Sequence, residues 1–124
     1  MKLPANPALP GETENLLRLL RDIIRAINDL SSDGTLTLNY STVSGDYTTT
    51  VADCTLEYTT GTYTVTLITA VGNEGKVFNI KNSGTGVITV DGSGTETIDG
   101  NLTVTLNQYD NLTIQSNGTN WIVL

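Results

Sequence analysis

Histidine is absent from this sequence, and cysteine, aromatic and charged residues are scarce. The chain has 124 residues with no His, one Cys and an aromatic fraction of 6%. Without His, the Ser-His and Cys-His nucleophile systems and most zinc sites cannot form. The single Cys54 excludes an internal disulfide. We therefore expect no enzymatic activity, no catalytic residue, no metal centre and no cofactor.

Positive charge is also scarce. The chain carries 6 Lys and Arg against 13 Asp and Glu, a formal net charge of −7. All three arginines lie near the N-terminus, and the residues after them carry only Lys76 and Lys81 as cations. Such a surface repels phosphate groups, which argues against nucleic-acid partners. No apolar run approaches the roughly 20 residues of a membrane span, and the N-terminal residues lack the apolar stretch of a signal peptide, so we expect no membrane insertion and synthesis in the cytoplasm.

Thr, Asn, Ser and Gly take the place of the missing charged residues. Thr is β-branched and suits half-exposed strands, so this composition predicts a mainly β protein with a hydroxyl-rich surface. The low aromatic content predicts a thin core, which other copies of the chain would help to complete.

Residues 1–11 hold all three prolines, spaced three residues apart as in a polyproline II helix. One interpretation is a frayed terminus. The other is an extended peptide that docks into a groove on a larger partner, because a preformed extended chain loses little entropy on binding. The candidate docking residues are Leu3, Pro4, Pro7, Leu9 and Pro10.

Residues 12–33 are expected to form one amphipathic helix and the segment that terminates it. Its apolar residues are spaced four and three apart, which is the a/d seam of a coiled coil. The seam residues are Leu16, Leu20, Ile23, Ile27 and Leu30. One alternative is that this helix packs on its own β domain. We favour a short parallel trimer, because Ile occurs at both seam positions and apolar residues flank the seam.

From Thr35 onward the apolar period changes to two, and turn clusters rich in Gly, Asn and Asp separate the segments. The expected strands are 35–39, 47–51, 54–58, 62–68, 76–81, 86–91, 102–106, 111–116 and 120–124. We expect residues 35–124 to form an antiparallel β-sandwich or jelly-roll-like head. A type I′ turn is expected at Asn117-Gly118. The expected buried face comprises Tyr63, Val65, Leu67, Phe78, Ile80, Leu102, Val104 and Leu106.

The stretch DGSGTETIDG, residues 91–100, is the one that most resembles a metal site. It begins like an EF-hand calcium loop, but Glu96 stands where that loop needs Gly, and Leu102 stands where it needs a bidentate Glu. An EF-hand is therefore excluded. A looser cation site built from Asp91, Glu96 and Asp99 stays open, although acidic residues in Gly-rich turns are usually turn formers.

Trp121 is the only indole in the chain and lies in the last expected strand. It is either a core anchor or a stacking surface for a sugar ring. In the second interpretation Tyr109, Asn117 and Asn120 are further candidate glycan contacts.

Several segments carry a resemblance to a known family: FNIKNSGTGVITV (78–90), ETIDG (96–100), LNQY (106–109) and LTIQSNGTNWI (112–122). Together they resemble a β module of bacteriophage tail-fibre, tailspike and other virion-attached proteins, over about residues 62–124. The TIDG turn and the SNGTNW hairpin are the most specific parts. The resemblance implies trimers about a fibre axis and, for tip domains, contact with host-surface glycans.

These observations predict a structural component of a bacteriophage virion, such as a short head or tail fibre or a capsid decoration protein. Residues 1–11 would bind other virion proteins of the capsid or tail, 12–33 would form the homotrimer, and 35–124 would be displayed on the particle surface. The alternative is a carbohydrate-binding receptor-recognition module of a phage tail fibre.

Overall fold

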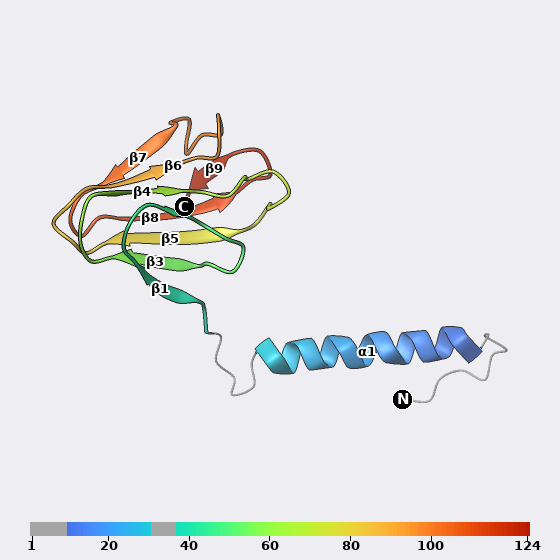
Figure 1. Ribbon diagram of the computed structural model, residues 1–124. Coiled ribbons are helices and arrows are strands. Elements are labelled where there is room, and N and C mark those ends of the chain that lie inside the picture. Colours follow the sequence, from blue (N-terminus) through green and yellow to red (C-terminus); the bar gives the residue numbers. More distant parts are fainter. Residues whose placement is uncertain (1–9, 31–36) are drawn as a thin grey trace. The chain divides into compact units, whose positions relative to one another are not determined.

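The computed structural model describes residues 10–30 and 37–124, which belong to two compact units. The first unit contains one helix, α1 (Pro10–Leu30), and the second contains the nine strands of the described chain (Figure 1). The predicted combination of a single helix and a mainly β head is confirmed. The two units are described separately below.

Helix α1 begins at Pro10, two residues earlier than predicted. Proline suits a first helical turn because its φ is preset and its missing N–H would have no partner there. The other candidate docking residues (Leu3, Pro4, Pro7 and Leu9) lie outside the described residues. The side chains of Ile27 and Leu30, in the last turn of α1, also lie outside them.

The strands form two mixed sheets. Sheet A has the order β1 (Tyr40–Val43), β3 (Thr55–Tyr58), β5 (Val77–Asn82), β8 (Asn111–Ser116) and β9 (Trp121–Val123). Sheet B has the order β2 (Tyr47–Thr48), β4 (Tyr63–Thr66), β6 (Ile88–Asp91) and β7 (Thr103–Leu106).

The first six strands alternate between the two sheets along the chain. Within sheet A, β1 pairs parallel with β3 and β3 with β5, while β2, β4 and β6 pair parallel in sheet B. The chain therefore winds through three stacked coils, each with one strand in either sheet. The expected antiparallel pairing is wrong for this part, because an apolar period of two shows which side of a strand is buried but not the direction of its neighbour. The remaining three strands, β7, β8 and β9, do pair antiparallel.

Glycines allow the corners of neighbouring coils to stack closely. The turn between β5 and β6 lies on the turn between β3 and β4, and a Cβ added at Gly86 would stand 2.0 Å from the carbonyl oxygen of Gly61. A Cβ at Gly84 would stand 2.8 Å from the backbone of Thr59. Only glycine permits this backbone approach, so the NSGTG turn is as important for the fold as the strands it joins.

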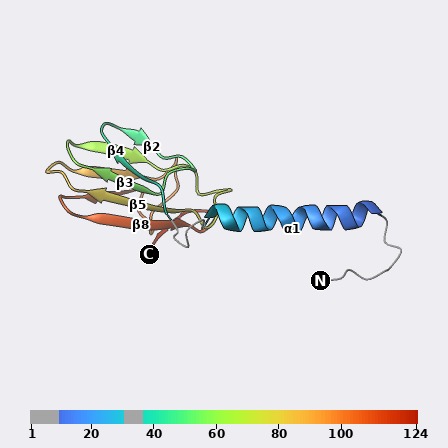
Figure 2. The same cartoon turned by 90° about the horizontal axis from the view of Figure 1, so that it is seen from below.

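The core lies between the inner faces of the two sheets, whose layers can be followed in Figure 2. Its largest side chains include Trp121, Tyr58 and Phe78. Most of the predicted buried face is confirmed: Val65, Leu67, Phe78, Ile80 and Leu106 are buried, and Tyr63 and Val104 pack against the core while partly exposed. The exception is Leu102, which precedes β7 and is 56% exposed.

The outer face of sheet B is formed largely by threonine. Register places Thr48, Thr66, Asp91 and Thr103 in one row, and Thr64, Thr89 and Thr105 in a second. The expected hydroxyl-rich surface is therefore present on this sheet.

Two tight turns lie in the antiparallel part. Asp99 (φ 47°) and Gly100 (φ 85°) form a two-residue turn in which Ile98 and Asn101 exchange both backbone hydrogen bonds, as in a type I′ hairpin. The predicted SNGT hairpin between β8 and β9 is present, but its loop has four residues. Asn117 is not among the residues of positive φ, so the type I′ prediction is wrong there. Its side-chain oxygen instead accepts the N–H groups of Thr119 and Asn120.

Candidate functional site

The residues predicted to contact glycans do not form one site. Trp121 is 1% exposed and packs against Phe78 with ring centroids 5.3 Å apart, so its ring is a core anchor and no sugar can stack on it. Asn120 uses its side-chain oxygen to accept the N–H of Thr97. Tyr109 is 68% exposed, but it precedes β8, whereas Asn117 follows it. The six-residue strand between them is about 20 Å long, which separates the two residues.

The three acidic residues of the open cation prediction are not gathered around a common point. The carboxylate of Glu96 accepts Thr69 Oγ1 at 2.5 Å and the N–H of Ala70 at 2.7 Å. Asp99 Oδ1 accepts the N–H of Val123 at 3.0 Å. In the part of the chain that the structure describes, no group of three His, Cys, Asp or Glu side chains could hold a metal ion. The carboxylates of Glu96 and Asp99 therefore hold turns and loops in place through these hydrogen bonds.

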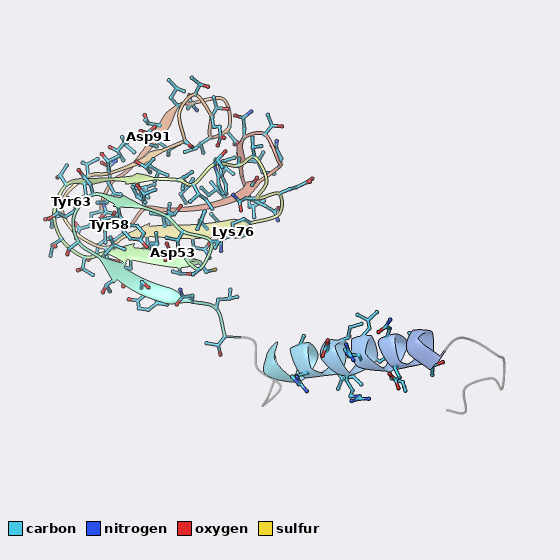
Figure 3. The ribbon with its side chains drawn as sticks, turned by 45° about the vertical axis from the view of Figure 1, so that its right-hand side comes forward. Asp53, Tyr58, Tyr63, Lys76 and Asp91 are labelled. Carbon is cyan, nitrogen blue, oxygen red and sulfur yellow. The ribbon has the colours of Figure 1, made fainter. Side chains whose placement is uncertain are left out.

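A second polar cluster surrounds the buried carboxylate of Asp53, in the loop before β3. Its Oδ2 accepts Tyr47 Oη at 2.8 Å and the N–H of Thr50 at 2.8 Å, and Lys76 Nζ donates to its backbone oxygen. Asp53 lies just before β3 and Lys76 just before the neighbouring strand β5, and Figure 3 labels both residues. The hydrogen bond to Asp53 raises the pKa of Tyr47. Asp53 is 6% exposed and is hydrogen-bonded from several sides, so this cluster holds loops together.

The outer face of sheet A carries a different cluster, which remains open to solvent. Register aligns Thr42, Glu57, Lys81 and Asn111 in one row across β1, β3, β5 and β8. Tyr40 Oη donates to Glu57 Oε1 at 2.5 Å, and Ser83 Oγ donates to Glu57 Oε2 at 2.5 Å. We call the set Tyr40, Glu57, Lys81, Ser83 and Tyr109 the sheet A platform.

Tyr109 lies at the far end of this platform in a strained backbone conformation. Its φ of 68° is in the left-handed region, which costs an L-residue with a side chain on the order of 1 kcal/mol. The strain is held by two hydrogen bonds: its N–H donates to Asn82 O at 2.5 Å and its carbonyl oxygen accepts Lys81 Nζ at 2.5 Å. The Lys81 ammonium also lies 5.9 Å from the centre of the Tyr109 ring. The ring is thus fixed at its base and exposed along its length.

Hydrogen bonds and charge keep the platform carboxylate ionised. The hydroxyl of Ser83, then that of Tyr40, and the positive charge of Lys81 lower the pKa of Glu57. The same hydrogen bond to Glu57 raises the pKa of Tyr40. At neutral pH the platform therefore presents one carboxylate and one ammonium from neighbouring strands, together with two exposed phenol rings.

Sequence reasoning identified Tyr109 but missed the rest of the platform. Residues 40–43 were not expected to form a strand, and without β1 nothing places Tyr40 beside Glu57. Glu57 and Lys81 are 24 residues apart and become neighbours only through the parallel register of β3 and β5. The one local signal was that Glu57 and Lys81 each lie at an outward position of an alternating strand.

The described part of the predicted seam of helix α1 is partly exposed. Leu16, Leu20 and Ile23 are 47%, 41% and 47% exposed. Among the residues that the structure describes, no helix is long and apolar enough to cross a membrane.

Comparisons of the chain with protein-family models, with curated proteins and with solved structures find no significant match.

Proposed function

We propose that this chain is a structural component of a bacteriophage virion that assembles as a homotrimer through α1 and displays its β head on the particle surface. The observation that carries the proposal is the apolar seam of α1, whose described side chains (Leu16, Leu20 and Ile23) are about half exposed. The resemblance of residues 62–124 to virion β modules supports the choice of particle.

A helix with this apolar seam is not expected to be stable by itself in water. Isolated helices are marginal in water, because nucleation is costly and tertiary packing normally supplies the stability. Burying a Leu or Ile side chain contributes roughly 1.5–3 kcal/mol. Association of several copies would bury the seam and stabilise the helix in one step.

The sequence around the seam favours three chains. Ile occurs at both seam positions, which disfavours a dimer. Apolar residues also occupy the positions beside the seam, where Leu17 is 39% exposed and Ile24 is 57% exposed. The opposite face carries Arg18, Asp22 and Arg25, which stay solvated in any bundle. A trimer covers this wide stripe better than a dimer and leaves the charged face in water.

Light scattering of the full chain at micromolar concentration tests the trimer. The wild type is expected at three times the chain mass of 13.2 kDa. Leu20→Asp with Ile23→Asp should give a monomer that retains the spectrum of the folded head. The matched control is Asn15→Asp with Arg25→Gln, which lowers the net charge by the same amount on the polar face and should remain trimeric. A monomeric wild type would show the trimer to be wrong.

The virion part of the proposal has its own test. Removal of residues 2–9 should leave a trimer in solution but abolish its recovery with purified particles. Electron microscopy of particles carrying a labelled chain would then show whether the head lies on the capsid or on the tail. Recovery of the truncated chain with particles would contradict the proposed docking role of Leu3, Pro4, Pro7 and Leu9.

A further inference from the structure

We propose that the outer face of sheet B binds the surface of ice, which is water in its crystalline lattice. We call this surface the threonine face, and its residues are Thr48, Thr64, Thr66, Thr89, Asp91, Thr103 and Thr105. The inference goes beyond the display role proposed above and does not depend on the trimer, because each head carries the complete face.

The concentration of threonine on this face is the first reason. Every outward position of sheet B except Asp91 holds threonine. The outer face of sheet A instead mixes threonine with Asn, Gln and the charged residues Glu57 and Lys81. The enrichment therefore belongs to one face of the head and is not simply a result of the threonine-rich composition.

The spacing of the hydroxyl groups is the second reason. Thr64, Thr89 and Thr105 stand in one row across β4, β6 and β7, and neighbouring strands lie about 4.8 Å apart. The second row, with Thr66 and Thr103, lies two residues further along the same strands, about 6.7 Å away. Both spacings are close to oxygen repeats on a prism face of hexagonal ice. Water molecules bound to this grid therefore stand near sites of the ice lattice.

The grid is held in place from the core side. Val65 and Val90, which alternate with the threonines, are fully buried, and Val104 packs against the core. Threonine itself is β-branched and has little χ1 freedom in a strand. Side chains that are ordered beforehand lose little entropy when they bind. The threonine face thus presents its hydroxyl groups at fixed positions.

The face also lacks the long charged side chains that do not fit into ice. Asp91 is the one charged residue of the threonine face, although the chain has a net charge of −7. An ionised group retains its liquid hydration shell, because removing that shell is costly. Threonine presents a methyl group, whose first-shell water has restricted orientations, beside a hydroxyl that donates one hydrogen bond and accepts two. Water on this face therefore matches the crystal, with Asp91 as the defect in the pattern.

Ice growth in the presence of the full chain tests the proposal. At concentrations up to millimolar, the wild type should slow the coarsening of ice crystals and should enter slowly grown ice, because it adsorbs to the crystal surface. A wild type that leaves the crystals unchanged and is rejected from the ice would overturn the proposal.

Two variants change the grid in opposite directions. Thr89→Lys places a charged side chain at its centre and should raise the concentration needed to stop coarsening at least about tenfold. Asp91→Thr completes the second row and should lower that concentration about threefold or more. Thr42→Lys adds the same charge to the outer face of sheet A, so it is the matched control and should act like the wild type.

The outcomes separate ice binding from folding and from the oligomer. Urea unfolding followed by the emission of Trp121, the only Trp, shows whether each variant retains the folded head. A folded Thr89→Lys as active as the wild type, or no gain in Asp91→Thr, would contradict the role of the grid and overturn the proposal. Equal losses in Thr42→Lys and Thr89→Lys would do the same. If the wild type is monomeric in light scattering but binds ice, this inference holds and only the trimer fails.

Discussion

The side-chain amide of Asn82 donates a 2.9 Å hydrogen bond to the carbonyl oxygen of Leu106, and so connects β5 of sheet A to β7 of sheet B. Asn82 is fully buried, and each of its polar groups is used. Its amide also donates to Gly86 O, and its side-chain oxygen accepts the N–H of Gly84. One residue thus fixes the coil corner and attaches the antiparallel strands to the parallel coils.

Asn82→Leu is expected to be strongly destabilising. The substitution removes the side-chain donor to the carbonyl groups of Gly86 and Leu106 and leaves the N–H of Gly84 with only its 3.2 Å hydrogen bond to Tyr58 O. Each group that water cannot reach costs about 1–3 kcal/mol when its partner is lost. We expect a total loss of about 3 kcal/mol or more, measured by urea unfolding of the full chain. Asn79→Ala is the matched control: Asn79 lies on the outer face and should lose less than about 1 kcal/mol. Similar losses for both variants would contradict the bracing role.

Gly86→Ala tests the stacking of coil corners. A Cβ at this position would stand 2.0 Å from Gly61 O, which belongs to the backbone and cannot rotate away. We expect a loss of about 2–3 kcal/mol, because the two turns must separate. Gly72→Ala is the control, since a Cβ there meets nothing within 4 Å and only its φ of 80° is strained. It should cost about 1 kcal/mol, and an equal loss in the two variants would count against close stacking.

Most strands of the head were predictable because they have a buried side and an exposed side. The strand expected at 35–39 is wrong, because residues 37–39 belong to no strand. Segment 111–116 was predicted as it stands in β8, and Asp99-Gly100 lies in one of the turn clusters that were expected to separate the strands. The missed strand β1 has the burial pattern of an edge, with Tyr40 exposed, so the apolar alternation that identifies inner strands is absent from it.

What sequence could not supply is which strands become neighbours. Nothing in the sequence marks Asn82 as a brace, because only the fold brings its side chain to Gly86 and Leu106. Glu57 likewise lies beside Lys81 only because β3 and β5 pair in parallel. Both the brace and the sheet A platform depend on contacts more than 20 residues apart. Local patterns of period two carry no information about those distances.

Trp121 offers a spectroscopic check of the core. As the only Trp, and at 1% exposure, it should emit at short wavelength and be poorly quenched by acrylamide until the head unfolds. Trp121→Ala should cost about 3–5 kcal/mol. Trp121→Phe should cost less, because it keeps an aromatic ring beside Phe78 and removes an indole N–H that has no partner. An indole readily quenched in the folded protein would contradict the buried position.

The pH dependence of stability follows from the carboxylate and phenol groups, because the chain has no His. Burial raises the pKa of Tyr58 to about 12. Its unfolded pKa is about 10, so its contribution is complete below about pH 10 and is lost as the pH rises toward 12. The pKa of Glu57 is lowered, so its contribution is present above its unfolded pKa of about 4.3 and is lost at lower pH. Stability should therefore be nearly constant between about pH 5 and 9.

Tyr58→Phe isolates the alkaline part of this profile. The phenol donates to Gly45 O at 3.2 Å, and its ring lies 6.0 Å from that of Tyr63; Figure 3 labels both tyrosines. Loss of the hydroxyl should cost about 1 kcal/mol at neutral pH. Above about pH 10 the variant should lose stability less steeply than the wild type, because phenylalanine has no proton to release. Urea unfolding followed by Trp121 fluorescence from pH 7 to pH 11 measures both, and an alkaline slope identical to that of the wild type would place the titrating group elsewhere.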